Sequence, residues 1–396
     1  MVNQKQLWLP ADSEHPEFPE PLHVGRPNIG NKERFLQRIN GMLDRRWFSN
    51  DGPLVREFES TVAEYVGAKH CIALCNATVG LEIAIRALDL RGEVIVPSYT
   101  FIATAHALAW QGIRPVFADI DPKTHNIDPS TVERLITPRT TGIIGVHVWG
   151  RPCETDALED IARRHGLKVM YDAAHAFESS REGVMVGNFG ECEVYSFHAT
   201  KFLNCFEGGA VVTNNDKLAE KVRLMRNFGF QGFDNVVSIG INGKMNEPCA
   251  AMGLTSLESI EQLIAINRRN HETYRKQLAG IPGIHLLERE TGEHHNYQYI
   301  VIEVDELLFG RSRDELVDLL HAQNIIARKY FWPGCHRMQP YATDDPHASR
   351  GLPETERVAA RVVVLPTGET VDPSIIERIC EIISTTAREA IFKVHE

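Results

Sequence analysis

Two kinds of apolar spacing alternate along most of the chain. Segments 32–47 and 52–67 place apolar residues three or four positions apart, as amphipathic helices do. Short unbroken apolar runs, such as 70–75 and 93–97, suit strands that are buried on both faces. Helix-length segments separate most of these runs, and parallel strands need such crossovers. The pattern predicts an α/β fold, with a mostly parallel sheet flanked by helices.

The alternation continues as far as residue 214. Further helices are predicted at 78–88, 102–112, 129–136 and 155–166. Further strands are predicted at 114–120, 141–149, 168–174, 193–197 and 209–214.

Changes in composition and pattern divide the chain into three parts. Residues 1–25 are rich in proline, glutamate and polar groups, and we expect an extended arm rather than a packed element. Residues 26–284 hold the predicted sheet and end with a long linking helix, 245–280, that has room for a bend. Residues 285–396 predict a smaller α+β domain, with strands at 297–304 and 325–330, a helix at 312–323 and helical segments near the end.

Composition and charge narrow the class of protein. The 396 residues are 43% hydrophobic and 24% charged, which is ordinary for a globular protein. A formal net charge of -11 disfavours nucleic acid as a partner and favours a small molecule. No apolar run approaches the roughly 20 residues that span a bilayer, and no signal pattern opens the chain, so we expect no membrane partner and a cytoplasmic location.

Cysteines and histidines give no sign of disulfides or metal. The eight cysteines are scattered without a C-x-x-C pair, so we expect reduced, mostly buried thiols. His271-Glu272 resembles the start of a zinc motif, but Arg275 occupies the second histidine position. No metal site is predicted.

Candidate chemistry gathers where the predicted strands end. Ligands of such sheets bind beyond the carboxyl ends of the strands. The residues at these ends are polar, aromatic or cationic: Asn76-Ala77-Thr78, Ser98 to Phe101, His147 and Trp149, Asp172 and His175, and Ser196, His198 and Lys201.

Each of these positions also has a purely structural interpretation. A helix that starts after Asn76 offers free N–H groups to a phosphate, yet Asn76 or Thr78 is equally suited to cap that helix. Asp172 is costly to bury unless it meets a cation or donors, and it also suits a helix cap. Lys201 alone would be an ordinary surface lysine.

The three positions together match pyridoxal phosphate (PLP), which has a phosphate, a pyridine nitrogen and an aldehyde. Asp172 would keep the ring nitrogen protonated. Lys201, its pKa lowered by poor solvation, would bond to the aldehyde and then move protons. Phe101 is expected either to stack on the cofactor ring or to be a core aromatic.

Four motifs in order carry a specific resemblance. VPSYTFIATAHAL (96–108), YDAAHAF (171–177), SFHATKFLNCFEGGAVVTNN (196–215) and NGKMNEPCAAMGL (242–254) resemble the sugar aminotransferases of the DegT/DnrJ/EryC1/StrS family, which are PLP enzymes of fold type I. The resemblance runs from about residue 25 almost to the C-terminus. It implies that Lys201 binds the cofactor covalently and moves the proton and that Asp172 pairs with the ring nitrogen. The other cofactor contacts that it implies are Phe101 stacking on the ring, His175 beside the ring hydroxyl, and Ala77, Thr78 and Ser196 at the phosphate.

The resemblance also implies a homodimer with shared active sites. Asn242 matches an asparagine that family members extend to the phosphate of the neighbouring subunit. Two departures bear on these contacts: the phosphate turn is Asn-Ala-Thr instead of Ser-Gly-Thr, and Lys244 replaces the commoner arginine.

Three segments indicate a narrower class of substrate: 145–158, 197–210 and 331–341. These segments are most similar to the 4-aminotransferases of thymidine-diphosphate (dTDP) 4-keto-6-deoxyglucose, which serve deoxysugar and antibiotic biosynthesis. The resemblance implies transfer of an amino group from L-glutamate to C4 of the sugar. Candidates for nucleotide binding are Lys329, Tyr330 and His336, with a structural role equally expected for each.

Three alternatives remain at this point. A 3-keto-sugar or keto-cyclitol aminotransferase would share the same residues, because the position of the ketone depends on how the sugar lies over the cofactor. A non-catalytic regulatory relative would keep the fold, although retention of Lys201 with Asp172 disfavours it. A nicotinamide dehydrogenase is disfavoured because no G-x-G-x-x-G follows a strand.

Overall fold

The structure, a computed structural model, describes residues 16–342 and 351–394. Its larger part is built on a seven-stranded sheet with the order β2-β10-β9-β6-β5-β3-β4. Only β10 runs antiparallel to its neighbours β2 and β9, so the predicted mostly parallel sheet is confirmed. The strands are β2 (His70–Leu74), β3 (Glu93–Pro97), β4 (Arg114–Ala118), β5 (Thr140–Val146), β6 (Lys168–Asp172), β9 (Glu193–Ser196) and β10 (Gly209–Thr213).

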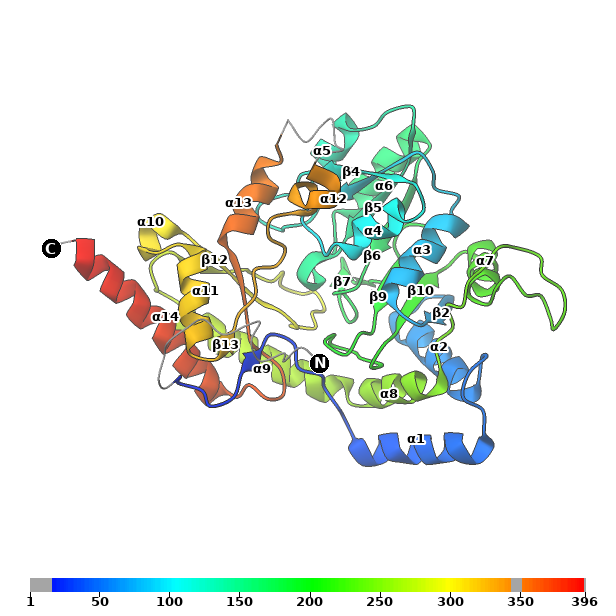
Figure 1. The fold of residues 1–396 in the computed structure, drawn as a ribbon, viewed down its shortest axis with the longest axis horizontal. Helices are drawn as coiled ribbons and strands as arrows, with labels where there is room; N and C mark the ends of the chain where they lie inside the picture. Colours follow the sequence, from blue (N-terminus) through cyan, green and yellow to red (C-terminus); the bar gives the residue numbers. More distant parts are fainter. Residues whose placement is uncertain (1–15, 343–350, 395–396) are drawn as a thin grey trace.

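Helices cover both faces of this sheet (Figure 1). Successive residues of a strand point to opposite faces. Cys71 and Ala73 of β2 therefore pack on one face with α2 and α8, while Ile72 and Leu74 pack on the other with α3, α4 and α7. The helices of this part are α2 (Pro53–Val66), α3 (Ala77–Ala87), α4 (Ala103–Ala109), α5 (Pro129–Arg134), α6 (Thr155–His165), α7 (Asp216–Arg226) and α8 (Glu247–Glu258). The pattern analysis did not predict α7, nor the short hairpin of β7 (Ser180–Arg181) and β8 (Val184–Met185).

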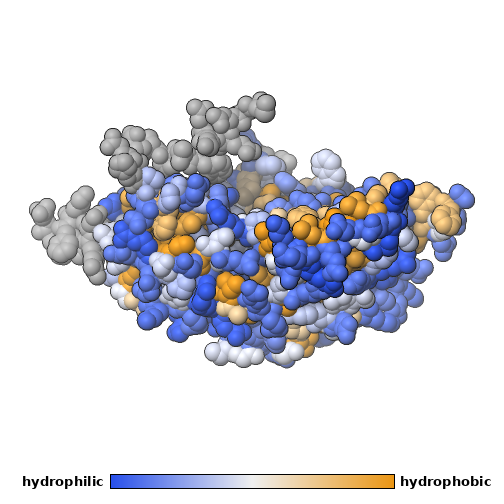
Figure 2. All heavy atoms as spheres, turned by 90° about the horizontal axis from the view of Figure 1, so that it is seen from below, coloured by the Kyte–Doolittle hydropathy of each residue, from blue (hydrophilic) through white to orange (hydrophobic). Residues whose placement is uncertain are grey.

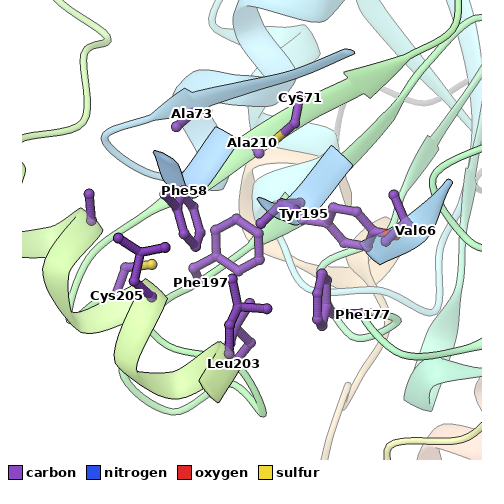
Figure 3. Packing of buried hydrophobic residues seen from close by; sticks show 14 of the residues in the cluster. Phe58, Val66, Cys71, Ala73, Phe177, Tyr195, Phe197, Leu203, Cys205 and Ala210 are labelled. Atoms are coloured by element: carbon purple, nitrogen blue, oxygen red, sulfur yellow. The ribbon is translucent and has the colours of Figure 1, made fainter. Parts of the chain in front are cut away.

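One apolar cluster lies between the sheet and α8, directly behind the segment that follows β9 (Figure 3). Phe197 meets Phe58 edge to face, with ring centroids 5.3 Å apart. Leu203 and Cys205, from the same segment, are buried in this cluster. The cluster fixes the residues on both sides of Lys201.

The long helix predicted at 245–280 is two helices. Ser259 separates α8 from α9 (Ile260–Leu278), because its backbone (φ -104°, ψ 7°) departs from helical values. This break is the bend for which the sequence left room. The first helix of the described chain, α1 (Lys32–Arg45), packs along α8.

The C-terminal part has its own core. A three-stranded antiparallel sheet has the order β11-β12-β14, with β11 (Ile284–Leu286), β12 (Ile300–Val304) and β14 (Val362–Leu365). Its apolar face packs against α9, α11 and α14. The remaining elements are α10 (Glu306–Phe309), α11 (Arg313–Ala322), β13 (Ile325–Ile326), α12 (Gln339–Ala342), α13 (Pro353–Arg361) and α14 (Pro373–Val394). The sequence analysis assigned β14 to a helical region, which is wrong, while the exact domain boundaries stay a prediction.

The end of the N-terminal arm is packed, contrary to expectation. The strand β1 (Leu22–His23) pairs in parallel with β13, with Leu22 opposite Ile325. Leu22 is buried in the core of the C-terminal part. The expectation of an unpacked arm is therefore wrong for this segment, and the part of the predicted arm at residues 1–15 lies outside the described residues.

The surface around α1 carries both hydrophobic and hydrophilic residues. Figure 2 views the molecule from the side of α1 and shows hydrophobic patches between hydrophilic ones. Leu36 and Leu43 of α1 are about half exposed, at 46% and 52%. Within the described ranges, no helix has both the length and the apolar character needed to cross a bilayer.

Candidate active site

A cavity of about 380 Å³ opens at the carboxyl ends of β2, β6 and β9, where the sheet predicts a ligand. Residues of both the large sheet and the C-terminal part line it. Eight of the residues proposed from sequence lie around it: Ala77, Thr78, Phe101, Asp172, His175, Ser196, Lys201 and Tyr330. The structure thus brings together side chains that are spread over about 250 positions of the sequence.

One end of the cavity is the start of α3. Asn76 caps this helix, because its side-chain oxygen accepts a hydrogen bond from Val79 N at 2.9 Å. The capping interpretation is therefore confirmed for Asn76, while Ala77 and Thr78 line the cavity at the first helical turn, where backbone N–H groups lack intrahelical partners. Gly209 of β10 allows this packing, since a Cβ there would lie 2.6 Å from Ala77 N. This end suits a phosphate.

Asp172 ends β6 and lies 6% exposed at the cavity. Its carboxylate accepts hydrogen bonds from the Thr104 hydroxyl at 2.8 Å and from Ala174 N at 3.1 Å. Burial raises the pKa of Asp172, and these two hydrogen bonds and the Lys201 ammonium oppose the rise. A buried carboxylate with only partial compensation is suited to a cationic ligand atom, such as a protonated ring nitrogen.

Lys201 is held by the segment that follows β9. Its backbone N–H donates to His198 O at 2.8 Å. Gln298, from the C-terminal part, accepts from Phe202 N at 2.9 Å and donates to Thr200 O at 3.2 Å. The residues on either side of Lys201 are therefore tied to a second region of the chain.

The Lys201 ammonium group donates to the Tyr299 hydroxyl at 3.3 Å. Burial lowers the pKa of Lys201 to about 8, and the Asp172 carboxylate opposes this shift. A lysine with this pKa is partly neutral near pH 7, so that it can act as a nucleophile and as a base. Tyr299 is also buried, and burial raises its pKa, so it remains a neutral phenol beside the amine.

His175 is a neutral imidazole in this environment. Burial and the nearby Lys201 charge lower the pKa of His175 well below its usual range. Trp149 N donates to His175 Nδ1 at 3.3 Å, so the proton resides on Nε2. The ring lines the cavity with a hydrogen-bond donor, which is the property needed beside a ring oxygen.

Phe101 is 59% exposed and lines the cavity. The alternative that it is a core aromatic is therefore wrong. A ring that is exposed at a cavity wall is free to stack on a flat ligand.

Three of the residues proposed from sequence do not line this cavity. Lys329 makes an ion pair with Asp314 at 2.9 Å on the surface. His336 is 2% exposed, hydrogen-bonded through Nδ1 to the Ser98 hydroxyl at 2.6 Å and through Nε2 to Glu356 at 3.1 Å. Asn242 is exposed on the segment between α7 and α8, beside Asn227. The structural alternatives thus describe Lys329 and His336, and Asn242 has no contact with this cavity within one chain.

The sequence analysis missed four residues of the site: Thr104, Gln298, Tyr299 and Phe331. Thr104 lies in the first turn of α4, and helical spacing made it look like an ordinary helix residue. Tyr299 and Gln298 immediately precede β12 in a small antiparallel sheet, where no rule of strand ends points to a ligand. Only their position in three dimensions gives them a role.

The histidines and carboxylates that line the cavity do not resemble a metal centre. In the described part of the chain, no group of three or more His, Cys, Asp or Glu side chains has the arrangement to hold a metal ion. All eight cysteines are free, and burial raises the pKa of Cys205, so that the thiol nearest Lys201 in sequence is unreactive.

The residues present fit PLP. A helix start suits its phosphate, a buried carboxylate suits its ring nitrogen, and a lysine of lowered pKa faces both. When bound, this cofactor supplies an aldehyde that takes up an amino group and a ring that withdraws electrons. The fold and the site therefore define a PLP-dependent enzyme.

Comparison with known proteins gives the particular family. The model of the DegT/DnrJ/EryC1/StrS aminotransferase family matches residues 30–384, and the chain belongs to this family. It is a PLP-dependent aminotransferase.

Several relatives are similar over nearly their whole length. The dTDP-4-amino-4,6-dideoxy-D-glucose transaminase of Shigella dysenteriae is 38% identical over 92% of this chain and 98% of the relative. The GDP-perosamine synthase of Caulobacter vibrioides is 37% identical over 82% and 88%. Among solved structures, DesI in the presence of its TDP-sugar product has a TM-score of 0.91 and 47% identity, covering 96% of this chain and 97% of DesI.

Proposed function

We propose that this enzyme transfers the amino group of L-glutamate to C4 of a dTDP-4-keto-6-deoxyhexose. The product would be a dTDP-4-amino-4,6-dideoxyhexose, the kind of compound named in the 38% identical relative from Shigella dysenteriae. The pathway, including the predicted role in antibiotic biosynthesis, and the cytoplasmic location stay predictions.

One observation carries the proposal: Lys201 and Asp172 are buried in the same cavity as the start of α3, in a chain 47% identical to DesI, whose crystal structure was analysed in the presence of its TDP-sugar product. The remaining walls of the cavity come from the C-terminal part, through Tyr299, Tyr330 and Phe331. Aromatic walls suit the apolar face of a 6-deoxysugar, which has a methyl group where most hexoses have a hydroxymethyl.

The residues of the chain have separate tasks in this reaction. Lys201, with a pKa of about 8, takes and returns the proton at the carbon that bears nitrogen. Asp172 holds the ring nitrogen of the cofactor in its charged form, and His175 donates a hydrogen bond from Nε2. The same groups serve both substrates, because glutamate and the keto sugar react one after the other in one cavity.

We further propose a homodimer in which Asn242 reaches the phosphate of the neighbouring subunit. The segment between α7 and α8 projects from the large part of the molecule (Figure 1). It exposes several apolar side chains, with Phe233 at 95% and Ile239 at 73%. Exposed apolar residues on a projecting segment are typical of a protein–protein contact, and Asn242 lies at its base.

The position of the ketone on the substrate is the part of the proposal for which a specific alternative exists. A 3-keto sugar or a keto-cyclitol would need the same Lys201 and Asp172, since both residues act at the cofactor and not at the sugar. Only the orientation of the sugar distinguishes the reactions. Relatives include a GDP-perosamine synthase, so the nucleotide also has to be tested.

The test uses the amino form of the enzyme, made with L-glutamate and freed of excess donor. Separate samples receive dTDP-4-keto-6-deoxyglucose, its 3-keto isomer, the GDP-linked 4-keto sugar and a keto-inositol. We expect the dTDP-linked 4-keto sugar to restore the original cofactor absorbance at least tenfold faster than the others. Faster recovery with the 3-keto sugar or the keto-inositol would refute transfer to C4.

A further inference from the structure

A second, smaller cavity of about 200 Å³ adjoins the active site. Here it is called the arm cavity, because the end of the N-terminal arm forms one wall. The residues that matter for its chemistry are His23, Thr200, Gln298, Tyr299, Arg328 and Tyr330.

The arm cavity and the cofactor cavity have three walls in common. Thr200, Tyr299 and Tyr330 line both. Thr200 directly precedes Lys201, and the Tyr299 hydroxyl is 3.3 Å from the Lys201 amine. A substituent of a substrate that reacts at Lys201 therefore has the arm cavity as its neighbouring space.

The arm cavity is positively charged, although the chain as a whole has a formal charge of -11. His23 and Arg328 line it, and Arg26 is close by. Burial lowers the pKa of His23, and the charges of Arg26 and Arg328 lower it further. The Arg328 guanidinium lies over the Tyr330 ring, 5.2 Å from its centroid, which directs this cation along the shared wall.

Three separate segments assemble this positive site. The pairing of His23 with Ile326 brings the arm against β13, two residues before Arg328. Gly25 brings the arm against the lysine segment, since a Cβ there would lie 3.1 Å from the Thr200 Cβ. The packed arm therefore places His23 at the wall of a cavity that adjoins the active site.

We propose that the arm cavity binds an anionic substituent of a substrate, a carboxylate of the amino donor or a phosphate of the nucleotide sugar. Its size suits one such group and not a whole nucleotide. The inference rests on the proposed function, because that function supplies substrates with these two groups. Arg328 supplies the fixed charge, and the arm supplies the His23 ring as a further wall of the cavity.

The first experiment measures binding without turnover. Cofactor-free protein is treated with diethyl pyrocarbonate, and modification of His23 is followed by peptide mass spectrometry. Glutarate, a dicarboxylate without an amine, and inorganic pyrophosphate are the two probes. We expect one of them to slow modification of His23 at least fivefold in the wild type and not in Arg328→Gln.

The second experiment measures each half-reaction separately. If the site binds a carboxylate, Arg328→Gln should raise the KM for L-glutamate at least tenfold and leave that for the keto sugar within twofold. If it binds a phosphate, the pattern reverses. Arg328→Lys should recover part of the loss, whereas Arg275→Gln, which removes a surface ion pair with Glu272, should change neither KM.

The outcomes separate this inference from the proposed function. No protection of His23 by either probe, together with unchanged KM values in Arg328→Gln, overturns the inference while the enzyme still turns over. A wild type that shows protection but reacts with no dTDP-linked 4-keto sugar refutes the proposed substrate and leaves the anion site supported. If Arg328→Gln does not fold, His23→Glu places a negative charge in the same cavity and must raise the same KM.

Discussion

The two sides of the active-site cavity are built in different ways. The cofactor side comes from the ends of β2, β6 and β9, which are neighbours or near neighbours in one buried sheet. The substrate side comes from the arm, from residues next to β12 and from residues that follow β13. The first side is fixed by regular secondary structure, and the second by contacts between distant segments.

This difference predicts a difference in function. Residues on the cofactor side act at the group that both substrates use, so their replacement must harm both half-reactions. Residues on the substrate side, apart from Tyr299, which contacts Lys201, face one substrate at a time, so their replacement should affect the two half-reactions unequally. The substitutions below test this contrast.

The largest effect is expected for Lys201→Met. Methionine fills similar space but neither bonds to an aldehyde nor moves a proton, so both half-reactions should fall by about 10⁴-fold or more. Stopped-flow absorbance of the bound cofactor measures each half-reaction. Lys168→Met, which removes an exposed ion pair with Glu191, is the control. If one half-reaction kept a rate near that of the wild type, the expected difference between the cofactor side and the substrate side would be contradicted.

Lys201→Met also makes a prediction on stability. Because burial lowers the pKa of Lys201 to about 8, its charged form is disfavoured in the folded state. The wild-type lysine therefore costs stability at pH 7, and the cost diminishes as the pH rises from about 8 toward the ordinary lysine value. Thermal melting of the cofactor-free proteins should show a higher melting temperature for Lys201→Met than for the wild type at pH 7. This difference in melting temperature should be smaller at pH 10.

The next effect is expected for Asp172→Asn. A carboxylate about 3 Å from a ring cation contributes roughly 5 kcal/mol at an effective dielectric of 20, part of which desolvation offsets. We expect both half-reactions to slow by about 10²- to 10³-fold, as a shift of two to three pKa units at the ring nitrogen implies. A tenfold larger effect on one substrate than on the other would contradict the placement of Asp172.

The stability of Asp172→Asn should move in the opposite direction to its activity. Burial raises the pKa of Asp172, so the charged carboxylate destabilises the fold above that pKa and is harmless below the unfolded value. The cofactor-free variant should thus melt no lower than the wild type at pH 7, with any gain vanishing near pH 4. A clear loss of stability at pH 7 would show that Asp172 is a structural residue.

The contrast between the two sides also explains what the sequence could predict. Lys201, Asp172 and Ala77 each follow a strand or begin the helix after one, so a rule about sheet edges finds them together. The rule about sheet edges does not identify Tyr299 or His23. Their roles depend on the packing of β1 against β13 and of the C-terminal part against the lysine segment, and no local pattern contains that information.

The sequence-based predictions that proved wrong also failed because of contacts between distant segments. Lys329 and His336 were candidates for nucleotide binding, but they pair with Asp314 and Glu356 instead. The arm looked extended because its composition is polar, yet its two strand residues pair with β13, and one of them, Leu22, is buried in the core of the C-terminal part. Long-range partners decided each of these cases.

A smaller effect is expected for Tyr299→Phe. Its hydroxyl is the acceptor for the Lys201 amine at 3.3 Å, so its loss removes one hydrogen bond from a buried ammonium. The pKa of Lys201 should fall further below about 8, and the half-reactions should slow by no more than about tenfold. Competitive acetylation of the cofactor-free protein at several pH values, with peptide mapping, measures the pKa of Lys201 directly. An unchanged midpoint would mean that Tyr299 does not hold the amine.

The smallest effect is expected for Lys329→Met. Its ammonium lies at the surface in an ion pair with Asp314, and such pairs contribute about 0–1 kcal/mol. The KM for the nucleotide sugar should therefore change by less than about twofold, and so should the melting temperature. Asp314→Asn is the matched variant, because it removes the same ion pair from the other side. If Lys329 instead binds the nucleotide, Lys329→Met alone raises the KM and Asp314→Asn lowers it, and the substrate side would then extend to the surface that the sequence first suggested.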